Sequence, residues 1–158
     1  MGNPGGSKEA EQSPSREAFQ VTPIAYMILR RGNRILILKR AKTGMFSLPA
    51  GHMEDGERSL ETAVREVEEE IGVKVEPSQA KFVHVGHFKD PIGERVAFFY
   101  ECASWTGEPQ LMEPHIHDET RWALIDNLPE NMQPYVRRSL ENIALQKPLT
   151  EYGWDQSS

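Results

Sequence analysis

The segment from Gly51 to Val73 concentrates negative charge. Its sequence, GHMEDGERSLETAVREVEEEIGV, contains eight carboxylates, and four of them lie within REVEEE. Like charges three or four positions apart on a helix repel, and converging glutamates raise one another's pKa values. A hard divalent cation such as Mg²⁺ or Mn²⁺ removes this repulsion, because both ions take oxygen ligands. Carboxylate-held Mg²⁺ usually keeps open positions for substrate phosphate, so the pattern points to a metal site for a phosphorylated substrate.

A helical wheel separates the two faces of the segment from Ser59 to Ile71. At about 100° per residue, Glu66, Glu69 and Glu70 fall on one face, and Arg65 lies where it can hold one of these carboxylates. The predicted buried face comprises Leu60, Ala63, Val64, Val67 and Ile71. The sequence therefore predicts an amphipathic helix that presents three glutamates on a side of their own.

The ends of this helix are also marked in the sequence. Ser59 is the expected N-cap, and Gly72 suits the left-handed residue that ends a helix. A run of charges is usually only a solvated helix face. Here the glutamates gather on one side, an arginine stands beside them, and glycines lie at both ends of the segment, so we favour the metal site over the solvated face.

The same spacing resembles the Nudix box, GX5EX7REUXEEXGU, in which U is an aliphatic residue. Gly51, Glu57 and the run from Arg65 to Val73 meet every fixed position of this motif. The flanking segments resemble the MutT-like branch of the Nudix superfamily: LPA at 48–50, WTGEP at 105–109 and WALI at 122–125. The resemblance covers most of residues 19–146.

This resemblance implies an α/β protein with a Nudix-type α/β/α sandwich and a mixed β-sheet, in which the box forms a loop, a helix and a loop. It also implies a hydrolase that depends on Mg²⁺, with Mn²⁺ as a substitute. Arg65 would orient the glutamates. The implied metal site comprises Glu66, Glu69, Glu70, the carbonyl of Ala50 and Glu57, the last of which supports the loop or reaches a metal through water.

Hydrolysis of a phosphoanhydride requires a water that attacks phosphorus and a general base that accepts its proton. Members of this family often take the base from a loop outside the box, and the candidate loop here is EPHIHDE at 113–119. Glu113 is our first candidate for the base and Glu119 the second, with Glu69 as the alternative inside the box. The catalytic residues we expect are therefore Glu113, Glu69, Arg65 and Glu119.

Several other residues have a plainer interpretation. His115 and His117 are more often solvated loop residues than metal ligands when no cysteine accompanies them. His52 could contact phosphate or be only a loop residue. The aromatic side chains of Tyr26, Phe46, Phe88 and 98–100 are expected in the core more than in stacking on a nucleobase.

Composition excludes several classes of protein. The chain has 158 residues, which fits one domain, and a net charge of −6, which argues against a protein that tracks a nucleic acid polymer. With one cysteine, no internal disulfide can form. We find no apolar run long enough to span a membrane and no signal peptide, so we expect a cytoplasmic protein. The expected partner is a small nucleotide, without nucleic acid polymer or membrane, and a homodimer remains open.

The substrate class follows from the resemblance by elimination. The SQPWPFPxS pattern associated with NADH hydrolysis is not in the sequence. We expect a nucleoside triphosphate, including an oxidised or non-standard one, to be cleaved to nucleoside monophosphate and pyrophosphate. The alternatives are another nucleoside diphosphate derivative, such as a nucleotide sugar or dinucleoside polyphosphate, and a Nudix module that binds its ligand without catalysis.

The chain divides into a tail and one folded unit. Residues 1–17 carry little to bury and are expected to be disordered, and residues 18–158 are expected to form a single Nudix hydrolase domain. Hydrophobic patterning predicts strands at 19–30, 34–40, 82–88, 95–103 and 122–125, a short extended stretch at 46–49, and helices at 59–71 and 134–146.

Overall fold

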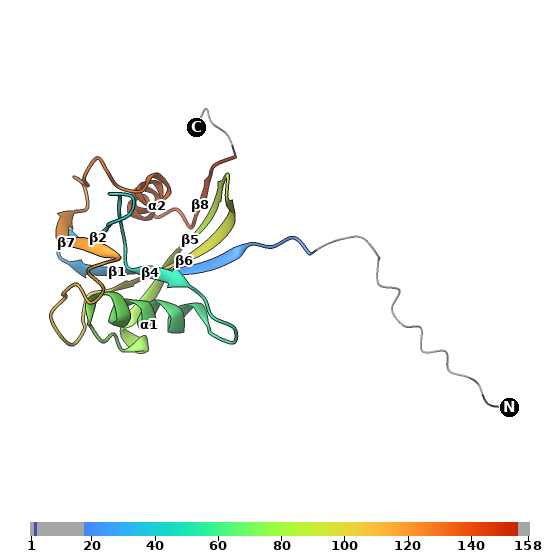
Figure 1. The fold of residues 1–158 in the computed structure, drawn as a ribbon, viewed down its shortest axis with the longest axis horizontal. Coiled ribbons are helices and arrows are strands. Elements are labelled where there is room, and N and C mark those ends of the chain that lie inside the picture. Colours follow the sequence, from blue (N-terminus) through green and yellow to red (C-terminus); the bar gives the residue numbers. More distant parts are fainter. Residues whose placement is uncertain (1, 3–17, 155–158) are drawn as a thin grey trace.

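The computed structural model describes Gly2 and residues 18–154, so the predicted disordered tail lies outside the described residues apart from Gly2. The described elements form a sheet with two helices (Figure 1). In chain order they are β1 (Thr22–Arg31), β2 (Arg34–Arg40), β3 (Phe46–Ser47), β4 (Ala50–His52), α1 (Ser59–Ile71), the 3₁₀ turn η1 (Pro77–Gln79), β5 (Ala80–Asp90), β6 (Gly93–Cys102), β7 (His117–Leu124), α2 (Pro134–Ala144) and β8 (Leu149–Tyr152).

The eight described strands join one sheet. The sheet is mixed, as the sequence predicted. Its main path runs β3-β2-β1-β6-β5-β8, while β4 pairs with β1 and β7 pairs with β2. The pairs β1–β6 and β5–β8 are parallel, and the remaining pairs between strands are antiparallel. Because β4 leads directly into the loop before α1, this pairing fixes the start of the box against the centre of the sheet.

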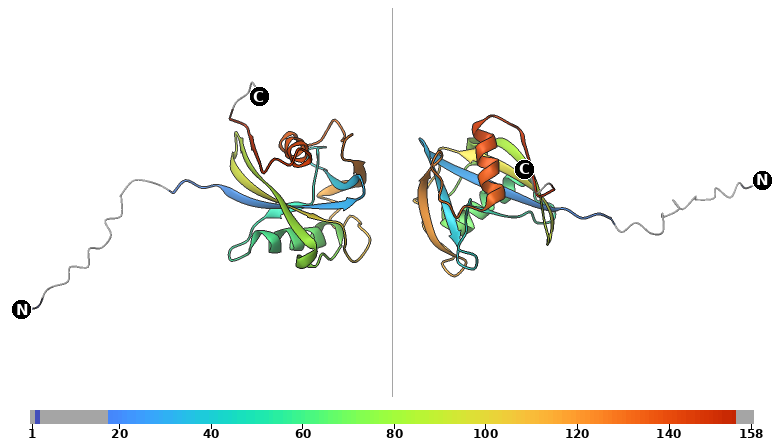
Figure 2. Two further views of the ribbon diagram at one scale, coloured as in Figure 1. Left: turned by 180° about the vertical axis from the view of Figure 1, so that it is seen from behind. Right: turned by 90° about the horizontal axis from the view of Figure 1, so that it is seen from above.

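The two helices cover opposite faces of the sheet, which confirms the predicted α/β/α arrangement (Figures 1 and 2). In β1, Ile24, Tyr26 and Ile28 belong to the core on the α2 side, whereas Ala25, Met27 and Leu29 belong to the core on the α1 side. A central strand that is covered on both faces must be apolar at successive positions. This explains why the sequences of β1 and β2 are nearly continuous aliphatic runs.

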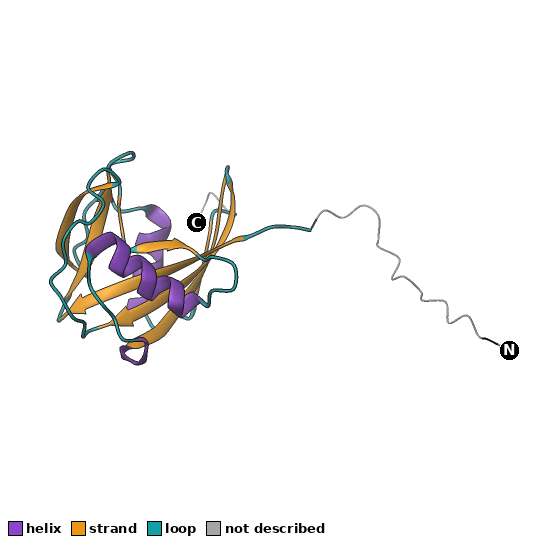
Figure 3. Ribbon diagram, turned by 60° about the horizontal axis from the view of Figure 1, so that its bottom comes forward, coloured by secondary structure: helices purple, strands orange, loops and turns teal. Residues whose placement is uncertain are grey.

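Helix α1 lies across the strands on one face of the sheet (Figure 3) and has the predicted bounds. It ends at Gly72, which adopts the expected left-handed conformation with φ of 73°. The predicted N-cap was wrong: Arg58 is the N-cap, and the Ser59 hydroxyl shares a 2.6 Å hydrogen bond with the Tyr100 hydroxyl. The Glu61 carboxylate accepts a hydrogen bond from the Arg58 backbone N–H at 3.4 Å.

The buried face of α1 is also narrower and more polar than predicted. Ala63, Val67 and Ile71 are buried, while Leu60 and Val64 are only half-buried. Thr62 and Glu70 are fully buried instead. Hydrophobicity could not indicate this, because the buried hydroxyl of Thr62 is satisfied by Glu57 in the loop before α1 and the buried carboxylate of Glu70 by the Ala50 backbone on β4.

Other elements differ from the sequence prediction at their ends. The strands β4 and β8 were not predicted, and β7 begins at His117, five residues before the predicted start at Trp122. Both β4 and β8 are short and take their conformation from pairing with β1 and β5, which a local pattern does not reveal. Within residues 18–154, no helix is long and apolar enough to cross a membrane.

A buried hydrogen-bond network links β8 to β5 and α2. His84 on β5 is fully buried, with Nδ1 2.8 Å from the Lys147 carbonyl and Nε2 2.6 Å from the Thr150 hydroxyl. Asn142 on α2 donates to the same hydroxyl at 2.9 Å. Burial lowers the pKa of His84 below its ordinary value of 6.5, against an opposing hydrogen bond to the Lys147 carbonyl. The ring is therefore held neutral in the folded protein.

We expect this histidine to make folding stability depend on pH. Above pH 6.5 both states carry a neutral ring and its full contribution is present. As the pH falls, the unfolded state takes up a proton first, so the free energy of unfolding decreases. We expect the free energy of unfolding, measured in urea, to be higher for the wild type than for His84→Gln, and this difference should shrink as the pH falls from about 7 to 5. A difference that stays constant over this range would contradict the interpretation.

Candidate active site

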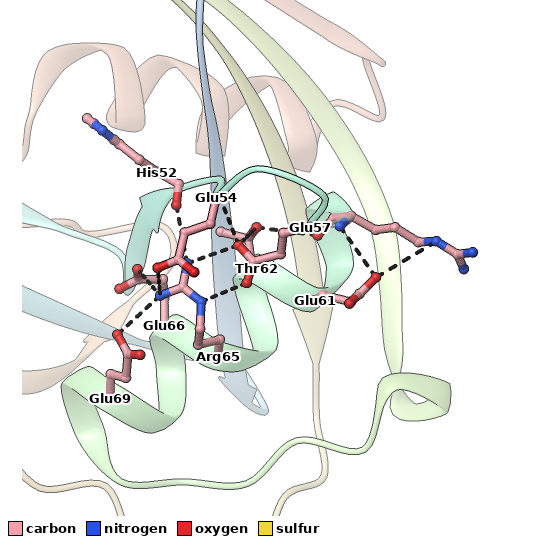
Figure 4. A network of polar contacts seen from close by, with 9 residues as sticks. His52, Glu54, Glu57, Glu61, Thr62, Arg65, Glu66 and Glu69 are labelled. Carbon is pink, nitrogen blue, oxygen red and sulfur yellow. Dashed lines mark hydrogen bonds and ion pairs between the residues drawn. The ribbon is translucent and has the colours of Figure 1, made fainter.

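Arg65 lies at the centre of a carboxylate network on α1 (Figure 4). Its Nε and Nη2 atoms donate to the two oxygens of Glu57 at 2.7 and 3.0 Å, and Nη1 donates to Glu66 at 2.8 Å and to Glu69 at 3.2 Å. The hydrogen bonds that Arg65 donates to Glu57, and then those to Glu66, raise the pKa of Arg65 above its ordinary value, against the opposing effect of burial. One guanidinium thus holds three of the expected site residues, as the sequence proposed for Arg65.

Glu57 connects this network to the loop before the helix. Its carboxylate also accepts hydrogen bonds from the Thr62 hydroxyl at 2.5 Å and from the Glu54 backbone N–H at 3.1 Å. The hydrogen bonds from Arg65, and then from Thr62, lower the pKa of Glu57 to about 2. With its oxygens engaged in this way, Glu57 has the contacts that loop support requires.

Gly51 allows Glu66 to approach β4. A Cβ atom at position 51 would lie 2.1 Å from Cδ of Glu66, which is far inside van der Waals contact. The glycine is therefore required by space and not by a left-handed backbone. This gives a physical reason for the glycine at the start of the box: without a side chain there, the Glu66 carboxylate lies directly against the strand.

Gly51→Ala should therefore impair the site more than the fold. The atom that must move is the end of a flexible glutamate side chain, so the melting temperature should change little. The displaced Glu66 would leave its position between Arg65 and β4. We expect metal affinity to fall by on the order of 10–100-fold, as for other losses of ligand support, measured by Mn²⁺ titration. Unchanged metal affinity in a folded variant would show that Glu66 is not a ligand.

Glu70 is the buried member of the cluster. It is 4% exposed, and its Oε1 atom accepts a 3.0 Å hydrogen bond from the Ala50 backbone N–H. Burial raises the pKa of Glu70 well above its usual range, and the nearby charges of Glu66 and Glu113 raise it further, against the hydrogen bond from Ala50. Burial likewise raises the pKa of Glu66, although Arg65 opposes the shift.

The donor set fits a hard divalent cation, because it consists of carboxylates on one side of α1, and two of them, Glu66 and Glu70, have raised pKa values that a positive counter-charge would lower. Within the part of the chain that the structure describes, no three acidic, histidine or cysteine side chains already converge as a metal-holding group. The reason is visible in the contacts: Glu66 and Glu69 are turned toward Arg65, and Glu70 toward Ala50. Glu69, with a side chain that is 54% exposed, is free to rotate toward a cation.

The structure separates the two candidates for the general base. The loop before β7 is fastened to the end of α1, since Gln110 and Met112 donate backbone hydrogen bonds to the carbonyls of Ile71 and Glu70 at 3.0 Å. The half-buried Glu113 follows Met112 in this loop, and its charge contributes to raising the pKa of Glu70. Glu119 instead lies on β7 and pairs with Arg121 at 2.5 Å and Lys39 at 3.5 Å.

A cavity of about 220 Å³ adjoins the acidic cluster. Glu70, Gly51 and His117 contribute to its wall, whereas neither Glu113 nor Glu119 does. On the other side Arg95 lies 4.6 Å from the ring of Tyr135, whose hydroxyl it contacts at 3.2 Å. Further lining residues are Ile24, Tyr26, Arg40, Thr43, Met45, Ser47, His52 and Gln133.

The aromatic residues considered for base stacking are largely in the core, as expected. Phe46, Phe88 and Phe99 are buried, and Tyr26 stacks on Phe99 with ring centroids 4.6 Å apart. Tyr26 is 3% exposed but contributes to the cavity wall. The sequence favoured His117 as a solvated loop residue, but its side chain is only 15% exposed and lies 3.5 Å from Glu70. The two residues are 47 positions apart, so no local pattern could indicate this contact.

The α/β/α sandwich with an acidic helix beside a cavity agrees with the fold that the Nudix resemblance implies. The family model for the NUDIX domain matches residues 19–143, so the chain belongs to the Nudix family and the resemblance inferred from the sequence is confirmed. The chain is 31% identical over 112 residues to the NAD-capped RNA hydrolase NudC of Stutzerimonas stutzeri, a match that covers 70% of this chain and 39% of the relative. It thus spans about two fifths of the length of such curated relatives.

Solved structures of MutT proteins resemble this fold. The MutT NUDIX hydrolase from Burkholderia pseudomallei superposes with a TM-score of 0.72 at 30% identity, covering 77% of this chain and 97% of the other. The MutT protein from Methanosarcina mazei Go1 has a TM-score of 0.72 at 19% identity, covering 83% and 98% of the two chains, and shows likeness of fold alone.

Proposed function

We propose that this chain is a Mg²⁺-dependent pyrophosphohydrolase that cleaves a nucleoside triphosphate to nucleoside monophosphate and pyrophosphate. The observation that supports this proposal most strongly is the position of the buried Glu70: it belongs to the acidic cluster of α1 and also lines the adjoining cavity. A polyphosphate could therefore reach the glutamates while the rest of the nucleotide occupies the cavity.

Glu66, Glu69, Glu70 and the carbonyl of Ala50 would hold the cation. A bound Mg²⁺ would neutralise phosphate oxygens and lower the pKa of a coordinated water. Arg65 keeps the carboxylates in place before the cation arrives, because its fixed guanidinium offsets their repulsion. Glu57 supports this arrangement from the loop. Mn²⁺ should substitute, since it accepts the same oxygen ligands.

Glu113 would accept the proton of the attacking water. It comes from outside the box, its charge contributes to raising the pKa of Glu70, and it forms no ion pair within residues 18–154, whereas Glu119 is paired with Arg121 and Lys39. Hydrogen bonding from Arg121 lowers the pKa of Glu119, which makes it a weaker proton acceptor. Glu69 remains the alternative base within the box.

A second candidate is cleavage of a dinucleotide pyrophosphate, of which NAD is one example. It is favoured by the identity of about 30% to NAD-capped RNA hydrolases of the NudC type. The missing SQPWPFPxS segment argues against this substrate. Nucleotide sugars, dinucleoside polyphosphates and ligand binding without catalysis remain the further alternatives.

A nucleotide panel separates these candidates. Purified full-length protein would be incubated with Mg²⁺ and nucleoside triphosphates, oxidised triphosphates, NAD, NAD-capped RNA, a nucleotide sugar and a dinucleoside polyphosphate. We expect pyrophosphate release from a triphosphate to be fastest. Preferential cleavage of NAD or capped RNA would select the second candidate, and binding without product from any compound would select the non-catalytic module.

A further inference from the structure

His117, the first residue of β7, lies against the candidate metal site. Its Nε2 atom is 3.5 Å from Oε2 of Glu70, and its side chain is 15% exposed. Its Nδ1 atom is buried without a hydrogen-bond partner. Within residues 18–154, the ion-pair contact of the His117 ring is the one with Glu70. A polar ring in such a position requires an explanation, because buried polar atoms are normally satisfied.

Two residues approach the Glu70 carboxylate, one at each oxygen. Ala50 on β4 donates its backbone N–H to Oε1 at 3.0 Å, and His117 on β7 approaches Oε2. Each oxygen of a carboxylate has two lone pairs, so these contacts leave acceptor sites for a cation. Such outer contacts fix the direction in which a ligand presents its oxygen atoms.

The backbone of His117 ties the same residue to the candidate base. Its N–H donates to the carbonyl of Glu113 at 3.0 Å, closing the turn that carries this glutamate. One residue therefore touches both the buried box carboxylate and the loop from outside the box. Its neighbour His115, which lies in the same turn, is exposed.

We propose that His117 is a positioning residue, whose Nε2–H holds Oε2 of Glu70 in the direction needed to bind the divalent cation. This inference rests on the proposed metal site. It differs from direct ligation, which would require the Nε2 lone pair and not an N–H group to face the cation. It also differs from simple packing, which would require only the volume of the ring.

Mn²⁺ binding to the full-length protein distinguishes these roles, measured by the electron paramagnetic resonance signal of the free ion. His117→Leu retains much of the volume without a donor and should weaken Mn²⁺ binding by about 10–100-fold. His117→Gln keeps an N–H donor and should bind close to the wild type. His115→Ala is the matched control and should be unchanged. Melting temperatures in EDTA would verify that each variant is folded.

The inference would be overturned if His117→Leu bound Mn²⁺ like the wild type, or if His117→Gln were as weak as His117→Leu. Should His117→Leu fail to fold, ¹⁵N-histidine NMR of the wild type decides: the proton must reside on Nε2, and its resonance must shift in Glu70→Gln.

Hydrolysis is measured separately on the wild type. If the wild type binds Mn²⁺ but cleaves no nucleotide, the proposed function fails while the role of His117 stands; if the wild type binds no Mn²⁺, both fail.

Discussion

Glu70→Gln should remove nearly all turnover while the fold persists. Glutamine keeps an oxygen that can accept the 3.0 Å hydrogen bond from the Ala50 backbone, so the local structure has no reason to rearrange. The substitution removes a charge that burial already disfavours. The metal-free protein should therefore be as stable as the wild type or more stable, whereas the cation loses a ligand.

The loss in kcat/KM should exceed the roughly 10–100-fold that follows from losing an outer-shell partner of a metal. Steady-state kinetics at several Mg²⁺ concentrations would measure it, and melting temperatures in EDTA would measure the effect on the apo protein. Glu68→Gln provides the matched control, because Glu68 belongs to the same helix but is exposed to solvent. A fully active Glu70→Gln enzyme would mean that the box glutamates have only a structural role here.

Glu113→Gln should lower kcat by on the order of 10²–10⁴, the usual contribution of general-base catalysis. KM and Mg²⁺ affinity should change little, because the group is required mainly in the transition state. The backbone of the loop is held by the carbonyls at the end of α1, so an amide in place of the carboxylate should leave the loop in position. Rapid-quench and steady-state measurements would separate the chemical step from binding.

Glu119→Gln is the comparison for this experiment. Its salt bridges with Lys39 and Arg121 are at the surface, where such pairs contribute little to stability. We therefore expect nearly normal kcat from this variant. If Glu119→Gln is inactive and Glu113→Gln is active, the assignment of the base is reversed. If both are active, the base lies within the box and Glu69 is the first residue to test.

Much of the site could be predicted from sequence because it lies on one helix. The 3.6-residue period places Glu66, Glu69 and Glu70 on a common side, and the structure shows Arg65 bonded to the first two. The hydrophobic patterning of β1 and β2 likewise indicated strands, although not that both faces of the sheet are covered. These features depend on local periodicity, which a single sequence contains.

Contacts between distant segments could not be predicted in this way. The burial of Glu70 depends on Ala50 in β4, and the position of His117 depends on how the loop after β6 packs on the end of α1. The strand β8 pairs with β5, and His84 contacts Thr150 between these two strands. Such pairings are set by tertiary structure, so local propensity gives no sign of them.

The most direct test is removal and return of the metal during turnover of the best nucleotide in the panel. Product formation should stop in excess EDTA and resume when Mg²⁺ is added beyond the chelator. The melting temperature should rise with the same addition, because the cation binds the native cluster and not the unfolded chain. Turnover that continues in excess EDTA would contradict the assignment of Glu66, Glu69 and Glu70 as the metal site.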